Sequence, residues 1–360
     1  MQYITAYIDK NALVHNIKQI KKLVPQSNVI AVVKANAYGH GAYAVTNALK
    51  EHVQGFAVAR ISEAIELRKE GITTPIFLLE GFYNDEDVAF ISRYNLYTSV
   101  HDIEQVEAIE KAKVNKQIHV WLQIDVGMHR LGSCDKETIF EIKKRLEACK
   151  NVVKPIGLIS HLSVADTPSE NDYNQKQIQF FKEIAKEFEG DLCLTNSAGI
   201  FKWPESHTQW VRPGIVIYGI SPFDDKVGSD LNLIPAMTLE CSILALHKVK
   251  KGDKIGYGAY FVADKDTTIG VISCGYGDGY PRCAPNGTPV LVNGRIVPTA
   301  GHVCMDMMFV DLGPNAKDRI GDKAVLWGKG LPVETIAKKC NTIPYELICH
   351  IMPRVNIEFG

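Results

Sequence analysis

The sequence predicts an α/β protein in which an N-terminal (β/α)8 barrel is followed by a mainly β domain. The chain has 360 residues, enough for a barrel of about 250 residues and a smaller partner. Over the first two-thirds, short apolar runs alternate with amphipathic stretches, the pattern of βαβ units in a parallel sheet. Later segments are of β type and are joined by turns. We therefore place the barrel at residues 1–234 and the β domain at residues 235–360.

The elements of the barrel are predicted from the spacing of their apolar residues. The first helix spans residues 9–24, because Leu13, Ile17 and Ile20 lie on one stripe. Eight candidate strands follow, enough to close a barrel: 29–33, 56–59, 76–79, 96–99, 118–124, 156–160, 192–194 and 210–216. Helices are expected between them at 63–69, 103–111, 139–148 and 172–188.

The β domain is predicted from short apolar runs between turns rich in Gly, Pro and Asp, such as Asn293-Gly294. Its expected strands are 239–249, 267–274, 289–292, 295–299 and 307–310, and short helices are expected at 333–338 and 345–351. Its Gly- and Tyr-rich segments do not form a dinucleotide fingerprint, and taken alone they would be turns with packing tyrosines.

Composition and charge limit the classes of function. Forty basic and forty-one acidic side chains give a formal charge of −1, which argues against a nucleic-acid or membrane-surface role. The nine cysteines are dispersed and never form Cys-x-x-Cys, so we expect reduced thiols and no metal site. No signal peptide is evident, and no apolar run approaches the ~20 residues that span a bilayer. We therefore expect a soluble, cytoplasmic protein.

Chemically active side chains gather at the carboxyl ends of the predicted barrel strands, where barrel enzymes carry their catalytic groups. Lys34 directly follows the first strand, His161 ends the sixth, and Arg212 lies in the eighth. The other candidates at this mouth are Tyr38, Arg130, Asn196, Ser197, Gly214 and Ile215. The opposite ends of the strands carry no comparable set, so the sequence predicts one active site at this mouth.

Lys34 is the most informative single residue. Partial desolvation of an amine at the end of a buried strand favours its neutral, nucleophilic form and thus Schiff-base formation. The alternative is a lysine that merely extends from the barrel rim into water. From position alone, both interpretations stay open.

Three other groups also have two interpretations. Ser197, Gly214 and Ile215 could offer a hydroxyl and backbone N–H groups to a phosphate, or form ordinary turns. Arg130 could bind a substrate carboxylate or an acid on a neighbouring strand. His161, taken alone, would more often be a hydrogen-bonded core histidine than a ligand.

Eight motifs, in one order along the chain, resemble those of bacterial alanine racemases. The first, Ala31-Val-Val-Lys34-Ala-Asn-Ala-Tyr38-Gly-His-Gly, is similar to the segment that attaches pyridoxal phosphate in that family. The others are Asp125-Val-Gly-Met-His-Arg130-Leu-Gly, His161, Asn196-Ser197-Ala, Arg212-Pro-Gly-Ile-Val-Ile-Tyr-Gly, Gly256-Tyr257-Gly, Gly275-Tyr-Gly-Asp-Gly-Tyr and Met305-Asp306. Matches in both domains favour the functional interpretation of Lys34.

The resemblance implies a role for each matching residue. Lys34 would hold the cofactor and act as the base on one face of the substrate, and Tyr257 of the other subunit would be the opposite base. Arg212, supported by His161, would face the pyridine nitrogen, where a cation weakens the electron sink. The remaining cofactor-binding residues would be Tyr38, Asn196, Ser197, Gly214 and Ile215.

The resemblance also implies how the substrate is bound and admitted. Arg130 and the backbone of Met305 would hold its carboxylate. Residues at the entrance would be Tyr276, Arg282 and Asp166.

The sequence departs from the family pattern at three positions. Gln123 stands where many members carry a lysine, carbamylated in some, that steadies the arginine seven residues later. His302 replaces an expected entrance arginine. The second entrance tyrosine expected near the C-terminus is absent, with Pro353 closest to its place. These changes bear on substrate preference more than on reaction type.

We therefore expect a homodimer with pyridoxal phosphate that interconverts L- and D-alanine with two bases and supplies D-alanine for peptidoglycan. One alternative is a related racemase with broader or serine preference. Another is a barrel-fold amino-acid decarboxylase, which would need an acid where Arg212 stands. A single-barrel cofactor carrier would leave the β domain and Tyr257 unexplained.

Overall fold

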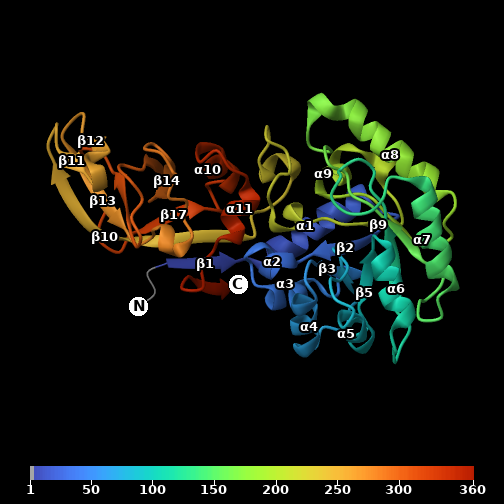
Figure 1. The fold of residues 1–360 in the computed structure, drawn as a ribbon. Coiled ribbons are helices and arrows are strands. Elements are labelled where there is room, and N and C mark those ends of the chain that lie inside the picture. Colours follow the sequence, from blue (N-terminus) through green and yellow to red (C-terminus); the bar gives the residue numbers. More distant parts are fainter. Residues whose placement is uncertain (1–3) are drawn as a thin grey trace.

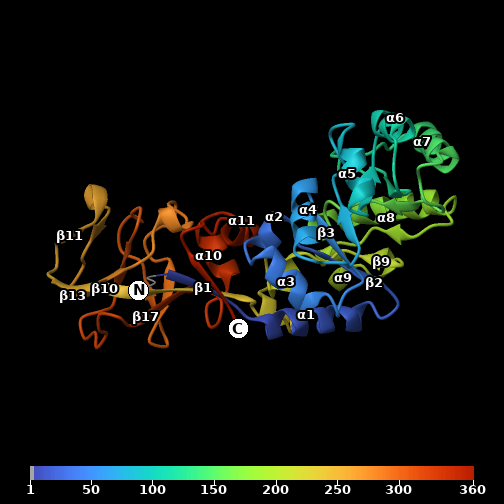
Figure 2. The same cartoon turned by 90° about the horizontal axis from the view of Figure 1, so that it is seen from below.

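The computed structural model describes residues 4–360 and shows a barrel beside a second, mainly β region (Figures 1 and 2). Eight parallel strands close the barrel in sequence order, which confirms the predicted fold class. They are β2 (Asn28–Val32), β3 (Gly55–Val58), β4 (Ile76–Leu78), β5 (Tyr97–Val100), β6 (His119–Gln123), β7 (Gly157–Ile159), β8 (Leu192–Cys193) and β9 (Trp210–Val211). Asn28 of β2 pairs with Trp210 of β9 and closes the ring.

The barrel strands are short apolar runs because both of their faces are covered, one by the barrel interior and one by helices. All four residues of β3 are buried, as are the last four of β2. The helices of this region are α1 (Lys10–Leu23), α2 (Lys34–Tyr38), α3 (Ala42–Leu49), α4 (Ile61–Lys69), α5 (Asp87–Arg93), α6 (Ile103–Lys111), α7 (Lys136–Ala148), α8 (Asn171–Ala185) and α9 (Ser197–Lys202).

Helix α1 shows why these segments begin where they do. The carboxylate of Asp9 accepts the backbone N–H groups of Asn11 and Ala12 at 2.8 and 3.1 Å, which satisfies donors that the first turn leaves free. Leu13, Ile17 and Ile20 are fully buried, as their spacing predicts.

The second region is built on one eight-stranded, mainly antiparallel sheet with a separate two-stranded ribbon. The sheet contains β1 (Ile4–Ile8), β10 (Met237–Val249), β13 (Thr267–Ile272), β14 (Pro289–Val292), β15 (Arg295–Pro298), β16 (Met308–Asp311), β17 (Lys323–Trp327) and β18 (Asn356–Phe359). The ribbon is β11 (Lys254–Ile255) with β12 (Phe261–Val262), and two helices, α10 (Val333–Lys339) and α11 (Pro344–Cys349), complete the region.

Two expectations about strands are wrong. The predicted strand 210–216 is too long, because β9 ends at Val211 and its last two predicted residues belong to the 3-10 turn Ile215–Tyr218. Pro213 has no N–H for a ladder and interrupts the strand. In addition, β1 was not predicted; it pairs antiparallel with β10 and parallel with β18. The second sheet thus includes both ends of the described chain, and a domain boundary at residue 235 remains a prediction.

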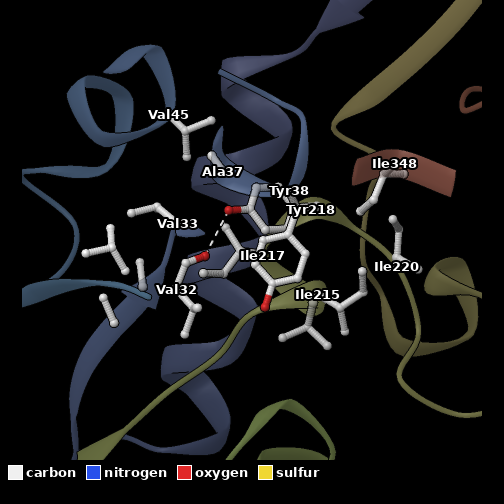
Figure 3. Close-up of a cluster of buried hydrophobic side chains, with 14 of the residues drawn as sticks. Val32, Val33, Ala37, Tyr38, Val45, Ile215, Ile217, Tyr218, Ile220 and Ile348 are labelled. Atoms are coloured by element: carbon white, nitrogen blue, oxygen red, sulfur yellow. Dashed lines mark hydrogen bonds between the residues drawn. The ribbon is translucent and has the colours of Figure 1, made fainter. Parts of the chain in front are cut away.

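A buried cluster joins the end of β2 to the 3-10 turn Ile215–Tyr218 and to α11 (Figure 3). The rings of Tyr38 and Tyr218 pack 5.0 Å apart, and the Tyr218 hydroxyl donates to the Val32 carbonyl oxygen at 2.9 Å. Ile348 of α11 belongs to the same cluster. The end of β2 is therefore held on one side by apolar contacts from a distant part of the chain.

Candidate active site

A cavity of about 710 Å³ opens at the carboxyl ends of the barrel strands. Most of its lining residues lie at the ends of different barrel strands or in the loops that follow them, so closure of the barrel brings these side chains together. The predicted site residues in its wall are Lys34, Tyr38, Arg130, His161, Asp166, Asn196, Ser197, Arg212, Gly214 and Ile215. Within residues 4–360, no group of three or more His, Cys, Asp or Glu side chains could hold a metal ion.

Lys34 is followed by a run of left-handed backbone. The φ angles of the next four residues, Ala35, Asn36, Ala37 and Tyr38, are 51°, 54°, 53° and 53°. None of them is glycine, and this conformation costs an L-residue roughly 1–2 kcal/mol. The turn sets the directions in which Lys34 and Tyr38 leave the end of β2, and nothing in the sequence predicted it.

Polar contacts from two residues hold this left-handed turn. The Glu63 carboxylate accepts the N–H of Ala35 at 2.6 Å and also the N–H groups of Ala59 and Arg60, both at 2.9 Å. On the other side, the Asn36 side chain accepts the N–H of Ala42 at 2.8 Å. The first turn of α4 is therefore bonded directly to the strained backbone beside Lys34.

The residues predicted to bind a phosphate form one donor-rich corner. The Gly214 N–H donates to the Ser197 hydroxyl at 2.8 Å, which leaves the hydroxyl proton of Ser197 available to a ligand. A Cβ atom at Gly214 would lie 2.8 Å from the Tyr38 hydroxyl oxygen, so only glycine allows this approach. Burial raises the pKa of Tyr38 far above its usual value, so its hydroxyl remains a donor. Within residues 4–360, the Ile215 N–H has no hydrogen-bond partner.

Arg212 is a buried cation that is satisfied without a carboxylate. Its guanidinium donates to the carbonyl oxygens of Ser160 and Cys193 at 2.6 and 3.1 Å and lies 3.3 Å from Nδ1 of His161. Burial, aided by Arg212, Arg130 and Lys34, lowers the pKa of His161 to about 3. A neutral His161 can accept an N–H from Arg212, and this corner of the cavity carries net positive charge.

Arg130 lines the same cavity and is exposed, on the loop that follows β6. Asp125 shapes this loop, because its carboxylate accepts the N–H groups of Gly127 and Met128 at 2.7 and 2.8 Å. Across residues 4–360, no carboxylate pairs with the Arg130 guanidinium. Gln123, at the end of β6, lines the same cavity and is buried. Arg130 is thus a cation free to bind an anionic ligand.

Asn196 has a structural part in the same corner. Its side-chain oxygen accepts the N–H of Gly199 at 3.0 Å and caps α9, and its amide nitrogen donates to the Leu162 carbonyl oxygen at 3.0 Å. These two bonds hold the start of α9, and with it Ser197, against the loop after β7.

The residues predicted in the β domain do not reach the cavity of their own chain. Tyr257 lies on the turn between β11 and β12, at the end of the molecule farthest from the barrel, and is 72% exposed (Figures 1 and 2). Met305 is also exposed, and Tyr276 and Arg282 do not line the cavity. One chain therefore presents the two predicted bases on separate surfaces.

Among the lining residues that were not predicted as part of the site are Tyr345 and Cys349 of α11. The ring of Tyr345 lies 6.0 Å from that of Tyr38. A tyrosine from the C-terminal part of the chain thus reaches this mouth, at position 345, whereas Pro353 does not line the cavity. The visible signal was Pro344, a typical first residue of a helix, which places the next residue on the first turn of α11.

His302, which replaces the expected entrance arginine, is engaged within its own domain. Its ring stacks on that of Tyr260 with centroids 4.0 Å apart, and its Nδ1 lies 3.1 Å from the Arg282 guanidinium. The predicted entrance residues Arg282 and His302 are thus neighbours in space.

Comparison with known proteins gives one family over both regions. Residues 8–222 match the family model described as alanine racemase, N-terminal domain, and residues 236–359 match alanine racemase, C-terminal domain. The alanine racemase of Photobacterium profundum is 50% identical over 361 residues, with both chains covered completely. That of Aeromonas hydrophila is 49% identical over 359 residues, also with complete coverage.

Solved structures agree with the sequence relatives. The biosynthetic alanine racemase from Pseudomonas aeruginosa superposes with a TM-score of 0.95 at 40% identity, covering all of both chains. The alanine racemase from Bartonella henselae, solved with covalently bound pyridoxal phosphate, gives a TM-score of 0.90 at 30% identity, again over both full chains. The chain belongs to the alanine racemase family.

Proposed function

We propose that this protein is a pyridoxal-phosphate-dependent racemase that interconverts L- and D-alanine, as a cytoplasmic homodimer that supplies D-alanine for peptidoglycan. The observation that carries the proposal is the convergence of Lys34, Arg130 and Arg212 on one cavity of a chain from this family. Serine or a broader set of small amino acids remains the alternative substrate range.

The cavity fits the cofactor. Pyridoxal phosphate needs an amine for its aldehyde, donors for its phosphate and a partner for its ring nitrogen. Lys34 offers the amine, while Tyr38, Ser197 and the N–H of Ile215 offer donors in one corner. Arg212 offers a buried guanidinium for the ring nitrogen. When bound, the cofactor supplies an electron-withdrawing group that acidifies the Cα–H bond of an amino acid.

Side chains of this protein would then bind the substrate and move its proton. The free guanidinium of Arg130 binds the carboxylate and orients the amino acid. Lys34 Nζ removes or returns the Cα proton on one face. Tyr257 Oη of a second subunit does so on the other face, since the exposed turn that carries it lies far from its own cavity.

A decarboxylase on the same fold is less well supported. It would place an acidic group at the ring nitrogen, but among residues 4–360 Arg212 is bonded to carbonyl oxygens, the Cys193 sulfur and His161 and to no carboxylate. A guanidinium at that position would keep the nitrogen unprotonated and make the cofactor a weaker electron sink. Such a sink would favour proton removal and return over decarboxylation.

Turnover of each alanine enantiomer tests the proposal. The purified protein, loaded with pyridoxal phosphate, is incubated with L- or D-alanine, and the products are separated by chiral chromatography. We expect both solutions to reach the same equal mixture, with serine converted more slowly. Loss of carbon dioxide instead of inversion would identify a decarboxylase, and no reaction with any small amino acid would contradict a racemase.

Attachment of the cofactor can be tested separately. Borohydride reduction of the loaded protein, followed by peptide mapping, should place the label on Lys34. A label on another lysine would contradict the assigned site, whatever the activity.

A further inference from the structure

Arg354 joins two loops of the β domain through three hydrogen bonds. Its guanidinium donates to Asp278 at 2.7 Å, to Asp306 at 2.8 Å and to the backbone carbonyl oxygen of Met305 at 3.2 Å. The Asp278 side chain is 6% exposed, whereas those of Arg354 and Asp306 are 45% and 58% exposed. Such a fork of bonds from one planar guanidinium fixes a geometry that a lysine could not reproduce.

The two loops are also paired through their backbones. The N–H groups of Tyr276 and Gly277 donate to the carbonyl oxygens of Cys304 and Met305 at 3.0 and 2.8 Å. A Cβ atom at Gly275 would lie 2.3 Å from the Met305 oxygen, and one at Gly277 would lie 2.6 Å from Arg354. The absence of side chains at both glycines lets the loops and the arginine meet.

This pairing fixes the direction of one backbone donor. The peptide bond between Cys304 and Met305 is planar and trans, so its C=O and N–H point in opposite directions. Its carbonyl oxygen faces Tyr276, and the Met305 N–H therefore points away from the paired loop. Across residues 4–360 this N–H has no hydrogen-bond partner. It is a donor held in place but left free for a ligand.

We propose that Arg354 is a positioning residue that holds the Met305 N–H ready to bind the substrate carboxylate in the partner subunit's cavity. We call the bonds of Arg354 to Asp278, Asp306 and the Met305 carbonyl oxygen the Arg354 clamp. The identity of the ligand rests on the proposed racemase function, while the clamp rests on these contacts alone. Asp278 and Asp306 anchor the guanidinium on both sides, and the guanidinium fixes the Met305 carbonyl oxygen. Arg354 itself does not contact the substrate.

Replacement of Arg354 by Met tests this role, with Arg295→Met as the matched control. Arg295 also bonds an aspartate of this domain, and the side chains of Arg295 and Asp318 are 42% and 1% exposed. Within the described part of the chain its hydrogen bonds go to Asp318 and the Leu312 carbonyl oxygen, and none goes to the loops that hold Met305. In Arg354→Met we expect KM for both alanine enantiomers to rise about tenfold, with kcat changed less, because a bond to a charged group is weakened before the reaction. The inhibition constant of acetate, a carboxylate without an amino group, should rise by a similar factor.

Hydrogen exchange gives a readout that does not depend on catalysis. The amides of Tyr276 and Gly277 should exchange faster in Arg354→Met and remain as protected as in the wild type in Arg295→Met. Arg354→Lys, which keeps the charge but not the fork, should lie between Arg354→Met and wild type in exchange and in KM. If KM changed equally in Arg354→Met and Arg295→Met, Arg354 would have only a general structural role.

Failure of the proposed racemase function and failure of the role of Arg354 give different results. If the wild type does not racemise alanine but Arg354→Met still loosens residues 275–279, the proposed function fails and the clamp stands. If alanine is racemised but the exchange of these amides is unchanged in Arg354→Met, the clamp is wrong. If Arg354→Met does not fold, the same comparisons are made with Arg354→Lys and Asp306→Asn.

Discussion

The two proposed bases, Lys34 and Tyr257, have different surroundings in one chain. Lys34 lies in the wall of the barrel-mouth cavity and, like Arg212 and Arg130, acts electrostatically on His161. Tyr257 is exposed on a two-stranded ribbon that a second subunit would have to cover. Such unequal settings predict that the loss of one base affects the two substrate enantiomers differently.

Replacement of Tyr257 by Phe should separate the two faces of the substrate. The variant keeps its cofactor but loses one proton acceptor, and removal of a general base typically lowers a rate by about 10²–10⁴. In deuterium oxide, we expect the variant to label D-alanine at Cα much faster than it racemises either enantiomer, as measured by mass spectrometry and chiral chromatography.

Tyr260→Phe is the matched control, because Tyr260 lies near Tyr257 and is also exposed. It should label both enantiomers as the wild type does. Equal labelling of both enantiomers at wild-type rates in Tyr257→Phe would show that one base, or water, serves both faces, and Tyr257 would then be only a packing residue.

The buried residue His40 should make stability depend on pH. Burial lowers its pKa to about 4, below the value of ~6.5 in an unfolded chain. Below pH ~6.5 the unfolded state takes up a proton that the folded state does not, so the stabilisation present above that pH is lost as pH falls toward 4. Between pH 6.5 and 5 we expect a loss of up to about 2 kcal/mol in the free energy of unfolding from this group alone.

His40→Gln isolates this contribution, because glutamine is neutral throughout and can still reach the Tyr38 carbonyl oxygen that His40 contacts at 2.9 Å. Thermal unfolding of the cofactor-free protein at pH 7.5, 6.5 and 5 should show a shallower decline for the variant. Parallel declines would show that His40 does not carry the effect.

The left-handed turn after β2 is the element on which the site depends most. Four consecutive residues with positive φ cost roughly 4–8 kcal/mol in total, so other contacts must hold the turn. The carboxylate of Glu63 provides three of them, and the buried cluster around Tyr38 and Tyr218 provides apolar packing. Glu63 therefore influences the position of Lys34 through the backbone of the turn, without a bond to the Lys34 side chain itself.

Replacement of Glu63 by Ala should loosen this turn. Loss of an acceptor that caps α4 and binds the turn should lower the free energy of unfolding by about 1–3 kcal/mol. Because Lys34 precedes the turn and Tyr38 is its last residue, the affinity for pyridoxal phosphate should fall as well. Calorimetry and absorbance titration with pyridoxal phosphate measure the two effects.

Glu66→Ala supplies the comparison, since Glu66 lies on the same helix and is exposed. It should change neither stability nor cofactor affinity by more than the usual small effect of a surface substitution, about 0.5 kcal/mol. A Glu63→Ala protein that binds the cofactor as tightly as Glu66→Ala would show that apolar packing alone holds the turn.

Elements with a strong local pattern could be predicted, and those defined by distant partners could not. The eight barrel strands and α6 follow from apolar runs and periodicity. Strand β1 was missed because five residues before a helix carry little signal until β10 and β18 pair with them. The left-handed turn was missed because its sequence favours no such conformation and Glu63 stabilises it from another segment.

For the whole molecule, the sequence predicted which barrel residues share the mouth but not which residues of the second region also line it. Lys34, His161 and Arg212 could be grouped because parallel strands bring their carboxyl ends to one side. Tyr345 could not, since α11 belongs to the second region and meets the mouth only through tertiary packing. The same separation of regions leaves Tyr257 far from its own cavity.

Shared active sites in a homodimer should allow two inactive chains to repair each other. Lys34→Ala lacks one base and Tyr257→Phe the other. If Tyr257 serves the partner's cavity, a hybrid dimer contains one site with both bases and one with neither. After random exchange, half of the dimers are hybrids, so activity should return to about one quarter of the wild-type value.

The control mixture pairs Lys34→Ala with a chain that carries both substitutions, and no arrangement of these chains gives a complete site. Subunit exchange is followed by native mass spectrometry, and racemisation is measured in the same samples. The cis alternative, in which Tyr257 reaches its own cavity, places at most one base in each hybrid site. Hybrids that form and remain as inactive as the control mixture would therefore exclude the shared site. Recovery near one quarter requires Lys34 and Tyr257 to come from different chains, which fits their separation on the surface of one chain.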